Sequence, residues 1–147
     1  MTEQSNETVV RDYAAALAVG DQDALGRLRH PDWTSDWPQS GERVRGHDRA
    51  LAIDAAYPGG RPAVQPDRVV GSEDRWVMTP LYHLQRIVGS GDSWWADGTI
   101  AYPDGSVWRL AMLMELRDGR IHRETTYFAE PFEAPPWRAP FVERFDP

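Results

Sequence analysis

The spacing of apolar residues changes along this chain, and the change restricts its fold more than any other feature of the sequence. Up to about residue 57, apolar residues recur every three or four positions, as on the buried face of an α-helix. After residue 66 they fall in short β-branched or aromatic runs with turn residues between them. Helices followed by an antiparallel meander predict an α+β fold, with the helices on one face of a curved sheet.

Three helices are predicted in the first part of the chain. The first covers residues 6–19. Asp21 is a suitable N-cap for a short second helix, which Pro31 ends. The third helix covers residues 47–57, and the Pro-Gly-Gly sequence at 58–60 terminates it.

Six strands are predicted in the second part. They cover residues 68–70, 75–78, 81–88, 93–102, 106–116 and 120–128. Turn sequences separate the last four: Gly-Ser-Gly-Asp at 89–92, Tyr-Pro-Asp-Gly at 102–105 and Asp-Gly at 118–119. The proline-rich segment after residue 129 is rich in aromatic residues, so we expect it to pack along the domain.

The strand at residues 107–116 is apolar on both faces. Trp108, Met112 and Met114 alternate with Ala111 and Leu113 along it. One face suits the core, and a symmetric partner subunit often covers the other face of a small sheet. We therefore expect a homodimer through the outer face of the sheet.

Length and charge limit the classes of protein to consider. The 147 residues suit a single domain, residues 1–147. A net charge of −7 with scattered arginines argues against nucleic acid or an anionic membrane as a partner. There is no apolar stretch of the ~20 residues needed to span a membrane, no signal-peptide pattern and no cysteine, so we expect a cytoplasmic protein.

Aromatic residues are the unusual part of the composition, with seven Trp among 147 residues. Two of them, Trp33 and Trp37, alternate with aspartates in the sequence HPDWTSDWP at residues 30–38. This segment is either the rim of an apolar pocket with a working acid, or a solvated turn between two buried rings. Trp108, Met112 and Met114 are likewise either plain core or the wall of a ligand pocket.

Two longer segments resemble a known superfamily. The sequences TVVRDYAAALAVGDQDALGRLRHPDW and GERVRGHDRAL are similar to the start of nuclear transport factor 2-like proteins. The sequence MELRDGRIHRETTYFAEPF is similar to their closing hairpin, in the SnoaL-like, polyketide cyclase-like branch. The resemblance implies a cone: a bent antiparallel sheet around a long N-terminal helix, with a deep pocket. Because members include ketosteroid isomerases, cyclases, dehydratases, epoxide hydrolases and non-catalytic proteins, the fold does not identify an activity.

The resemblance also suggests catalytic residues. Asp36 lies where ketosteroid isomerases carry a proton-shuttling aspartate, and burial between two Trp rings would raise its pKa. Tyr13 corresponds to the isomerase tyrosine that stabilises an oxyanion. The second isomerase donor is an acid, and Met112 occupies its position here. Each residue also has a structural interpretation: a solvated aspartate, and a buried core tyrosine.

Two more acids are candidates for the pocket. Alternation back from Phe128 places Thr126, Glu124 and His122 on one face, so Glu124 is a second acid if that face is the interior. Asp97 lies inside a strand, where Asp is disfavoured unless it has a function or faces solvent.

The sequence therefore leaves two classes of function. The first is an acid–base enzyme, an isomerase, cyclase or dehydratase, that acts without a cofactor on a small, hydrophobic, carbonyl-bearing molecule. The second is a non-catalytic ligand-binding or accessory homodimer. An epoxide hydrolase is a third alternative, but it requires an interior arginine, which the sequence does not place. No metal is expected, because His30, His47, His83 and His122 lack metal-ligand spacing.

Overall fold

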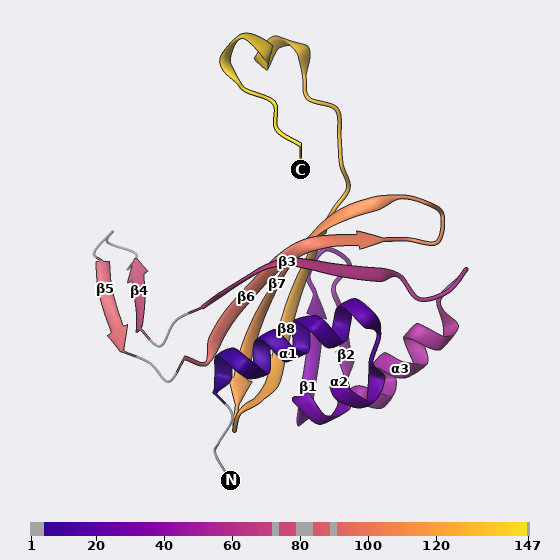
Figure 1. The fold of residues 1–147 in the computed structure, drawn as a ribbon, viewed down its shortest axis with the longest axis vertical. Helices are drawn as coiled ribbons and strands as arrows, with labels where there is room; N and C mark the ends of the chain where they lie inside the picture. The colour runs from indigo at the N-terminus through magenta and orange to yellow at the C-terminus, as the bar shows by residue number, and fades with distance from the viewer. Residues whose placement is uncertain (1–4, 72–73, 79–83, 89–90, 147) are drawn as a thin grey trace.

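The computed structural model describes residues 5–71, 74–78, 84–88 and 91–146, and it has the predicted α+β architecture (Figure 1). The helices are α1 (Asn6–Val19), α2 (Gln22–Leu28), α3 (His47–Ala56) and the 3-10 helix η1 (Pro136–Phe141). The strands are β1 (Arg29–Trp37), β2 (Glu42–Arg45), β3 (Ala63–Gly71), β4 (Asp74–Met78), β5 (Leu84–Val88), β6 (Ser93–Ala101), β7 (Val107–Arg117) and β8 (Arg120–Ala129). None of the described helices is long and apolar enough to cross a membrane.

Local sequence explains the helix boundaries. The Ser5 side chain accepts a hydrogen bond from the Thr8 backbone N–H and caps α1, and Gly20 ends that helix in the left-handed conformation at φ 69°. Asp21 caps α2 in the same way through the Ala24 N–H. The three predicted helices are therefore confirmed to within a few residues.

The main sheet has six strands in the order β2-β1-β8-β7-β6-β3, and α1 lies across it with α2 and α3 near β1 and β2 (Figure 1). Neighbouring strands are antiparallel, except that β1 runs parallel to β8. β4 and β5 form a separate antiparallel pair. The predicted strand residues 81–83 and turn residues 89–90 lie outside the described residues.

Sequence patterning missed the two strands that follow α2. The helix ends at Leu28 and β1 begins directly at Arg29, so Pro31 lies within a strand instead of ending a helix. The pairing of β1 with β8 shifts register between Arg29 and Thr34, around this proline. A proline has no N–H to donate, and a bulge accommodates it.

The edge strand β3 was predicted too short, because it too contains a proline. It begins at Ala63 and continues through Pro66, where its pairing with β6 shifts register. Because β3 forms an edge of the sheet, the missing proline N–H leaves no neighbour unpaired.

The sheet has an inner face toward α1 and an outer face away from it. Residues buried on the inner face include Trp33, Ile100, Leu110, Met112 and Met114, and they meet Val9, Val10, Tyr13 and Ala16 of α1. Positions 36, 97, 109, 113, 123 and 127 alternate with these inner positions and therefore lie on the outer face. The face on which a residue lies decides whether it reaches the core.

The C-terminal segment does not pack along the domain, so that prediction is wrong. After Ala129 the chain leaves the sheet and runs away from the helices (Figure 1). Its four large rings, Phe132, Trp137, Phe141 and Phe145, are 72–84% exposed.

Gly98 of β6 provides a test of the β3–β6 pairing. A Cβ atom added there would lie 2.9 Å from Pro66 Cα and closer still to the Gln65 carbonyl oxygen. Because both neighbours are backbone atoms, the strands would have to separate. We expect Gly98→Ala to lower the free energy of unfolding by about 2 kcal/mol in urea denaturation. Thr99→Ala, at the next position of the same strand, is the control; an equal loss in both variants would contradict the close approach.

Candidate active site

A cavity of about 450 Å³ lies between the inner face of the sheet and the helices. Apolar side chains form most of its wall, among them Leu25, Trp33, Trp37, Val44, Ile100, Trp108, Leu110, Met112 and Phe128. A few polar side chains are set among them: Arg29, Ser35, Asp54, Tyr57, Arg61, Glu124 and Thr126. This size and lining are typical of sites for small, largely apolar ligands.

Glu124 is the acid on the sheet side of this cavity, and the other acid of the lining, Asp54, lies on the opposite wall. It lies on the inner face of β8 and is only 3% exposed, which confirms that the Phe128 face of this strand is the interior. Its Oε1 accepts hydrogen bonds from the Tyr13 hydroxyl and from Trp33 Nε1, the latter at 3.0 Å. Among the described residues, no group bonds to Oε2, while Glu124 itself lines the cavity. One oxygen is therefore held by the protein and the other is available to a ligand.

The alternation of inner and outer side chains along β8 is interrupted on the N-terminal side of Glu124. The pairing of β7 with β8 shifts register between Glu115 and Leu116, and this bulge turns Ile121 into the core. His122, which strict alternation placed with Glu124, instead meets the His30 ring edge-on at 5.2 Å. A strand bulge cannot be read from period-two patterning, because it changes the period itself.

Arg29, at the start of β1, also bonds to Tyr13 and so extends the hydrogen-bonded group around Glu124. Its Nε donates to the Tyr13 hydroxyl at 2.9 Å, and its Nη1 lies 2.9 Å from His47 Nδ1. Its guanidinium also stacks 4.0 Å from the centre of the Trp33 ring. Since Arg29 can only donate, His47 Nδ1 must accept, which requires a neutral imidazole. Consistently, burial and then the Arg29 charge lower the pKa of His47.

Burial dominates the electrostatics of the site. It raises the pKa of Glu124, although the Arg29 charge and the hydrogen bonds from Tyr13 and Trp33 oppose the shift. Burial, followed by the negative charge of Glu124, raises the pKa of Tyr13 well above 10.0. The Tyr13 hydroxyl thus accepts from Arg29, donates to Glu124 and keeps its proton.

The expectation that Asp36 faces the pocket is wrong. Its carboxylate lies on the outer face, where it accepts hydrogen bonds from Arg43 at 2.6 and 2.8 Å and from Arg123 at 3.1 Å. These partners lower the pKa of Asp36, whereas burial between two rings was expected to raise it. Ser35 and Trp37, its neighbours in β1, are the residues that line the cavity. A strand points successive side chains to opposite faces, so two Trp residues on either side do not enclose an Asp.

Asp97 is also outside the cavity. It lies on the outer face of β6 and accepts a hydrogen bond from Arg68 at 2.6 Å. Of the other predicted pocket residues, Trp33, Trp37, Trp108 and Met112 line the cavity, whereas Met114 is buried beside Glu124 on β7 and not part of the lining.

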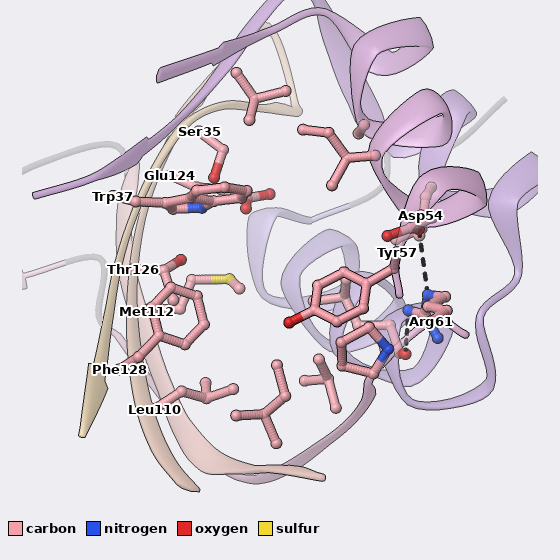
Figure 2. A pocket seen from close by; sticks show the side chains of 18 of the residues that line it. Ser35, Trp37, Asp54, Tyr57, Arg61, Leu110, Met112, Glu124, Thr126 and Phe128 are labelled. Carbon is pink, nitrogen blue, oxygen red and sulfur yellow. Dashed lines mark hydrogen bonds and ion pairs between the residues drawn. The ribbon is translucent and has the colours of Figure 1, made fainter. Parts of the chain in front are cut away.

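The wall opposite the sheet carries polar groups that sequence analysis missed (Figure 2). Arg61 bonds to Asp54 at 3.3 Å and to the Leu17 carbonyl oxygen at 3.0 Å. The Tyr57 hydroxyl, just after α3, points into the cavity toward the sheet (Figure 2). Arg29 was missed because residues 29–37 were not recognised as a strand, and because the register shift between Arg29 and Thr34 interrupts the alternation of that strand.

No group of three or more His, Asp or Glu side chains among the described residues could hold a metal ion. His83 lies outside those residues.

Comparison with known proteins agrees with this architecture. The sequence model of the SnoaL-like domain matches residues 10–124. A Kribbella flavida structure, provisionally named a ketosteroid isomerase, superimposes with a TM-score of 0.72 over 97% of this chain and 90% of that one, at 22% identity. An NTF2-like protein of unknown function from Burkholderia xenovorans gives 0.67 over 96% and 95%, at 29% identity. An epoxide hydrolase from M. tuberculosis, described as LEH-like, gives 0.60 over 84% and 81%, at 19% identity. No curated protein matches the chain.

The raised pKa of Glu124 predicts how stability depends on pH. A carboxyl whose pKa is higher in the folded state stabilises the protein below its unfolded value, near 4.5, and this contribution is lost as the pH rises through the folded pKa. Gln cannot ionise, so the free energy of unfolding of Glu124→Gln should not fall in this way. Relative to the wild type, it should rise by on the order of 1 kcal/mol between pH 4.5 and pH 8. Urea denaturation of both proteins across this range measures the difference. A difference independent of pH would contradict the raised pKa.

Proposed function

This chain belongs to the SnoaL-like domain family, and we propose that it is an enzyme that moves a proton on a small, largely apolar molecule held in the cavity. The observation that carries the proposal is the state of Glu124. A buried carboxyl with a raised pKa, anchored through one oxygen and open to the cavity through the other, is suited to general acid–base chemistry.

Glu124 is the proposed base in place of Asp36. Its Oε2 would take a proton from a carbon beside a carbonyl group: the C–H bond breaks, an O–H bond forms on the carboxyl, and the electron pair passes to the carbonyl oxygen as an enolate. Where a C=C bond is conjugated with the enolate, returning the proton from Glu124 to the far carbon shifts that bond and completes an isomerisation. Attack of the enolate on a second carbonyl carbon, with the proton passed to the resulting alkoxide, gives a cyclisation. Expulsion of a hydroxyl on the adjacent carbon as water, with the proton from Glu124, gives a dehydration.

Tyr13 is proposed to position the base instead of contacting the substrate. Its hydroxyl accepts a hydrogen bond from Arg29 and donates one to Glu124, and Tyr13 is not among the described residues that line the cavity. Together with Trp33 it fixes Glu124 in one orientation, which reduces the reorganisation needed at the reacting carbon. The donor for a substrate oxygen is then Tyr57, whose hydroxyl points into the cavity from the opposite wall (Figure 2).

The walls support a substrate that is mostly apolar with a single polar group. Rings and aliphatic side chains cover most of the sheet side, so the greater part of a ligand would be held there by apolar contacts, and the few polar side chains of the lining are left for its polar group. Exclusion of water by these walls strengthens the action of Glu124 on the polar group. Nothing in this chemistry requires a group beyond the side chains of the protein.

A non-catalytic ligand-binding role is the second candidate. It is favoured by the mutual satisfaction of Arg29, Tyr13, Trp33 and Glu124, since a purely structural buried cluster would also be hydrogen-bonded. The epoxide hydrolase alternative is not retained. Arg29 supplies an interior arginine, but Asp97, the acid considered for that chemistry, faces outward and pairs with Arg68. The other acid of the lining, Asp54, is bonded to Arg61 on the wall opposite Glu124.

Proton exchange separates the two candidates without knowledge of the natural substrate. In deuterated buffer, α-tetralone and β-tetralone acquire deuterium beside the carbonyl, and NMR follows the rate. We expect the wild type to accelerate this exchange, with a rate that rises with pH through the raised pKa of Glu124. Glu124→Gln should lower the acceleration by about 10²–10⁴-fold.

Asp36→Asn is the matched control, since it removes an acid of the outer face only, and its exchange rate should equal that of the wild type. Binding of the same ketones is measured by quenching of tryptophan fluorescence, because three Trp residues line the cavity. Ketone binding without accelerated exchange would favour the ligand-binding candidate and contradict the enzyme.

A further inference from the structure

The C-terminal arm, residues 130–146, is the largest part of the chain without a packing partner of its own. Its four large rings, Phe132, Trp137, Phe141 and Phe145, are 72–84% exposed, and Val142 is 48% exposed. Soluble chains expose single apolar side chains routinely, but a concentration of large rings in one segment marks a surface that binds another. The arm thus has the composition of an interface.

The arm is directed away from its own domain. It leaves β8 after Ala129 and extends from both the sheet and the helices (Figure 1). Prolines at 131, 135, 136 and 140 restrict its backbone, and η1 stiffens its middle. A stiff segment that starts in this direction is poorly placed to fold back on its own sheet.

A matching surface exists on the outer face of the sheet. Its centre is apolar, with Leu113 and Tyr127 48% and 46% exposed on the adjacent strands β7 and β8, and Val107 50% exposed at the start of β7. This patch and the root of the arm are continuous, because Ala129 pairs with Arg109, two residues from Val107. It is also the face that sequence patterning predicts to be covered by a partner subunit.

The charges of the two surfaces are complementary. The arm carries four acids, Glu130, Glu133, Glu143 and Asp146, against two arginines, in a chain whose net charge is −7. Arginines border the patch on the outer face: Arg43 and Arg123 share Asp36, Arg123 also lies 3.8 Å from Glu115, and Arg68 pairs with Asp97. Arg109, next to the root of the arm, has no ion pair among the described residues and is the positive charge left for an acid of the arm. An acidic, aromatic segment fits an apolar patch bordered by arginines.

We propose that the arm of one copy of this chain binds the outer sheet face of a second copy, and that two copies exchange arms in a symmetric dimer. Because arm and patch belong to the same chain, one twofold axis covers both patches and both arms at once. The four rings lie over Leu113, Tyr127 and Val107 of the other copy, and the arm acids lie toward its arginines. This assembly does not depend on the proposed chemistry of the cavity.

The mass in solution tests the exchange on the full chain. Light scattering at micromolar concentration should give about twice 16.7 kDa for the wild type. Replacing the rings by Ser at Phe132, Trp137, Phe141 and Phe145 should give the monomer mass, and so should Leu113→Arg on the receiving face. All five positions are exposed, so circular dichroism should show an unchanged fold.

Val19→Ser is the matched control, because Val19 is 79% exposed but lies on α1, away from both surfaces, and this variant should remain a dimer. A monomeric wild type would overturn the proposal. A variant that lacks the four rings but keeps the dimer mass would also overturn it, since the arm would then not hold the subunits together.

Cross-linking identifies the surface that the arm contacts. The chain contains no cysteine, so Phe141→Cys and Leu113→Cys can each be introduced alone, in proteins of different tag length. A short bis-maleimide should join the two proteins when they are mixed. A single protein that carries both Phe141→Cys and Leu113→Cys is the comparison. If the reagent links the two cysteines within that chain but never joins the two single-cysteine proteins, the arm folds back on its own sheet, which would contradict the exchange.

Discussion

The buried carboxyl of Glu124 is the constraint on which the rest of the site depends. An acid that is 3% exposed must be given hydrogen-bond donors, and it receives them from α1 through Tyr13 and from β1 through Trp33. Tyr13 in turn is oriented by Arg29, and Arg29 reaches α3 through His47. Helices and sheet are therefore joined around one proton-binding group, and its environment is set by the fold as a whole.

The two faces of the sheet separate two electrostatic environments with the same residue types. On the outer face, Asp36 meets arginines at the surface, and its pKa falls. On the inner face, Glu124 also has an arginine nearby, but burial outweighs that charge and its pKa rises. The difference is the loss of water, since an ion pair at the surface keeps hydration that a buried carboxyl has given up. Burial thus shifts the pKa of the inner acid upward, whereas ion pairing shifts the pKa of the outer acid downward.

The cavity and the arm place the apolar side chains of this protein in two different roles. Trp33, Trp37 and Trp108 are partly or fully enclosed and form a wall, so their surface is available to a ligand. The rings of the arm are outside the domain and are available to another protein surface. An aromatic-rich composition alone does not distinguish these uses, because the hydrophobic effect is non-directional and depends only on the area removed from water.

Local patterns were enough to predict the helices, most strands and the α+β class, because caps, turn residues and hydrophobic periods act over a few neighbouring residues. They also grouped Glu124 with Phe128 on one strand face and indicated four of the Trp and Met side chains that line the cavity, without deciding between core and pocket wall. Tertiary structure alone decided the face of Asp36, the bulge at His122 and the partnership of Arg29 with Tyr13. These depend on strand register and on contacts between segments up to 111 residues apart in the chain, and a shift of one residue exchanges the interior for the surface.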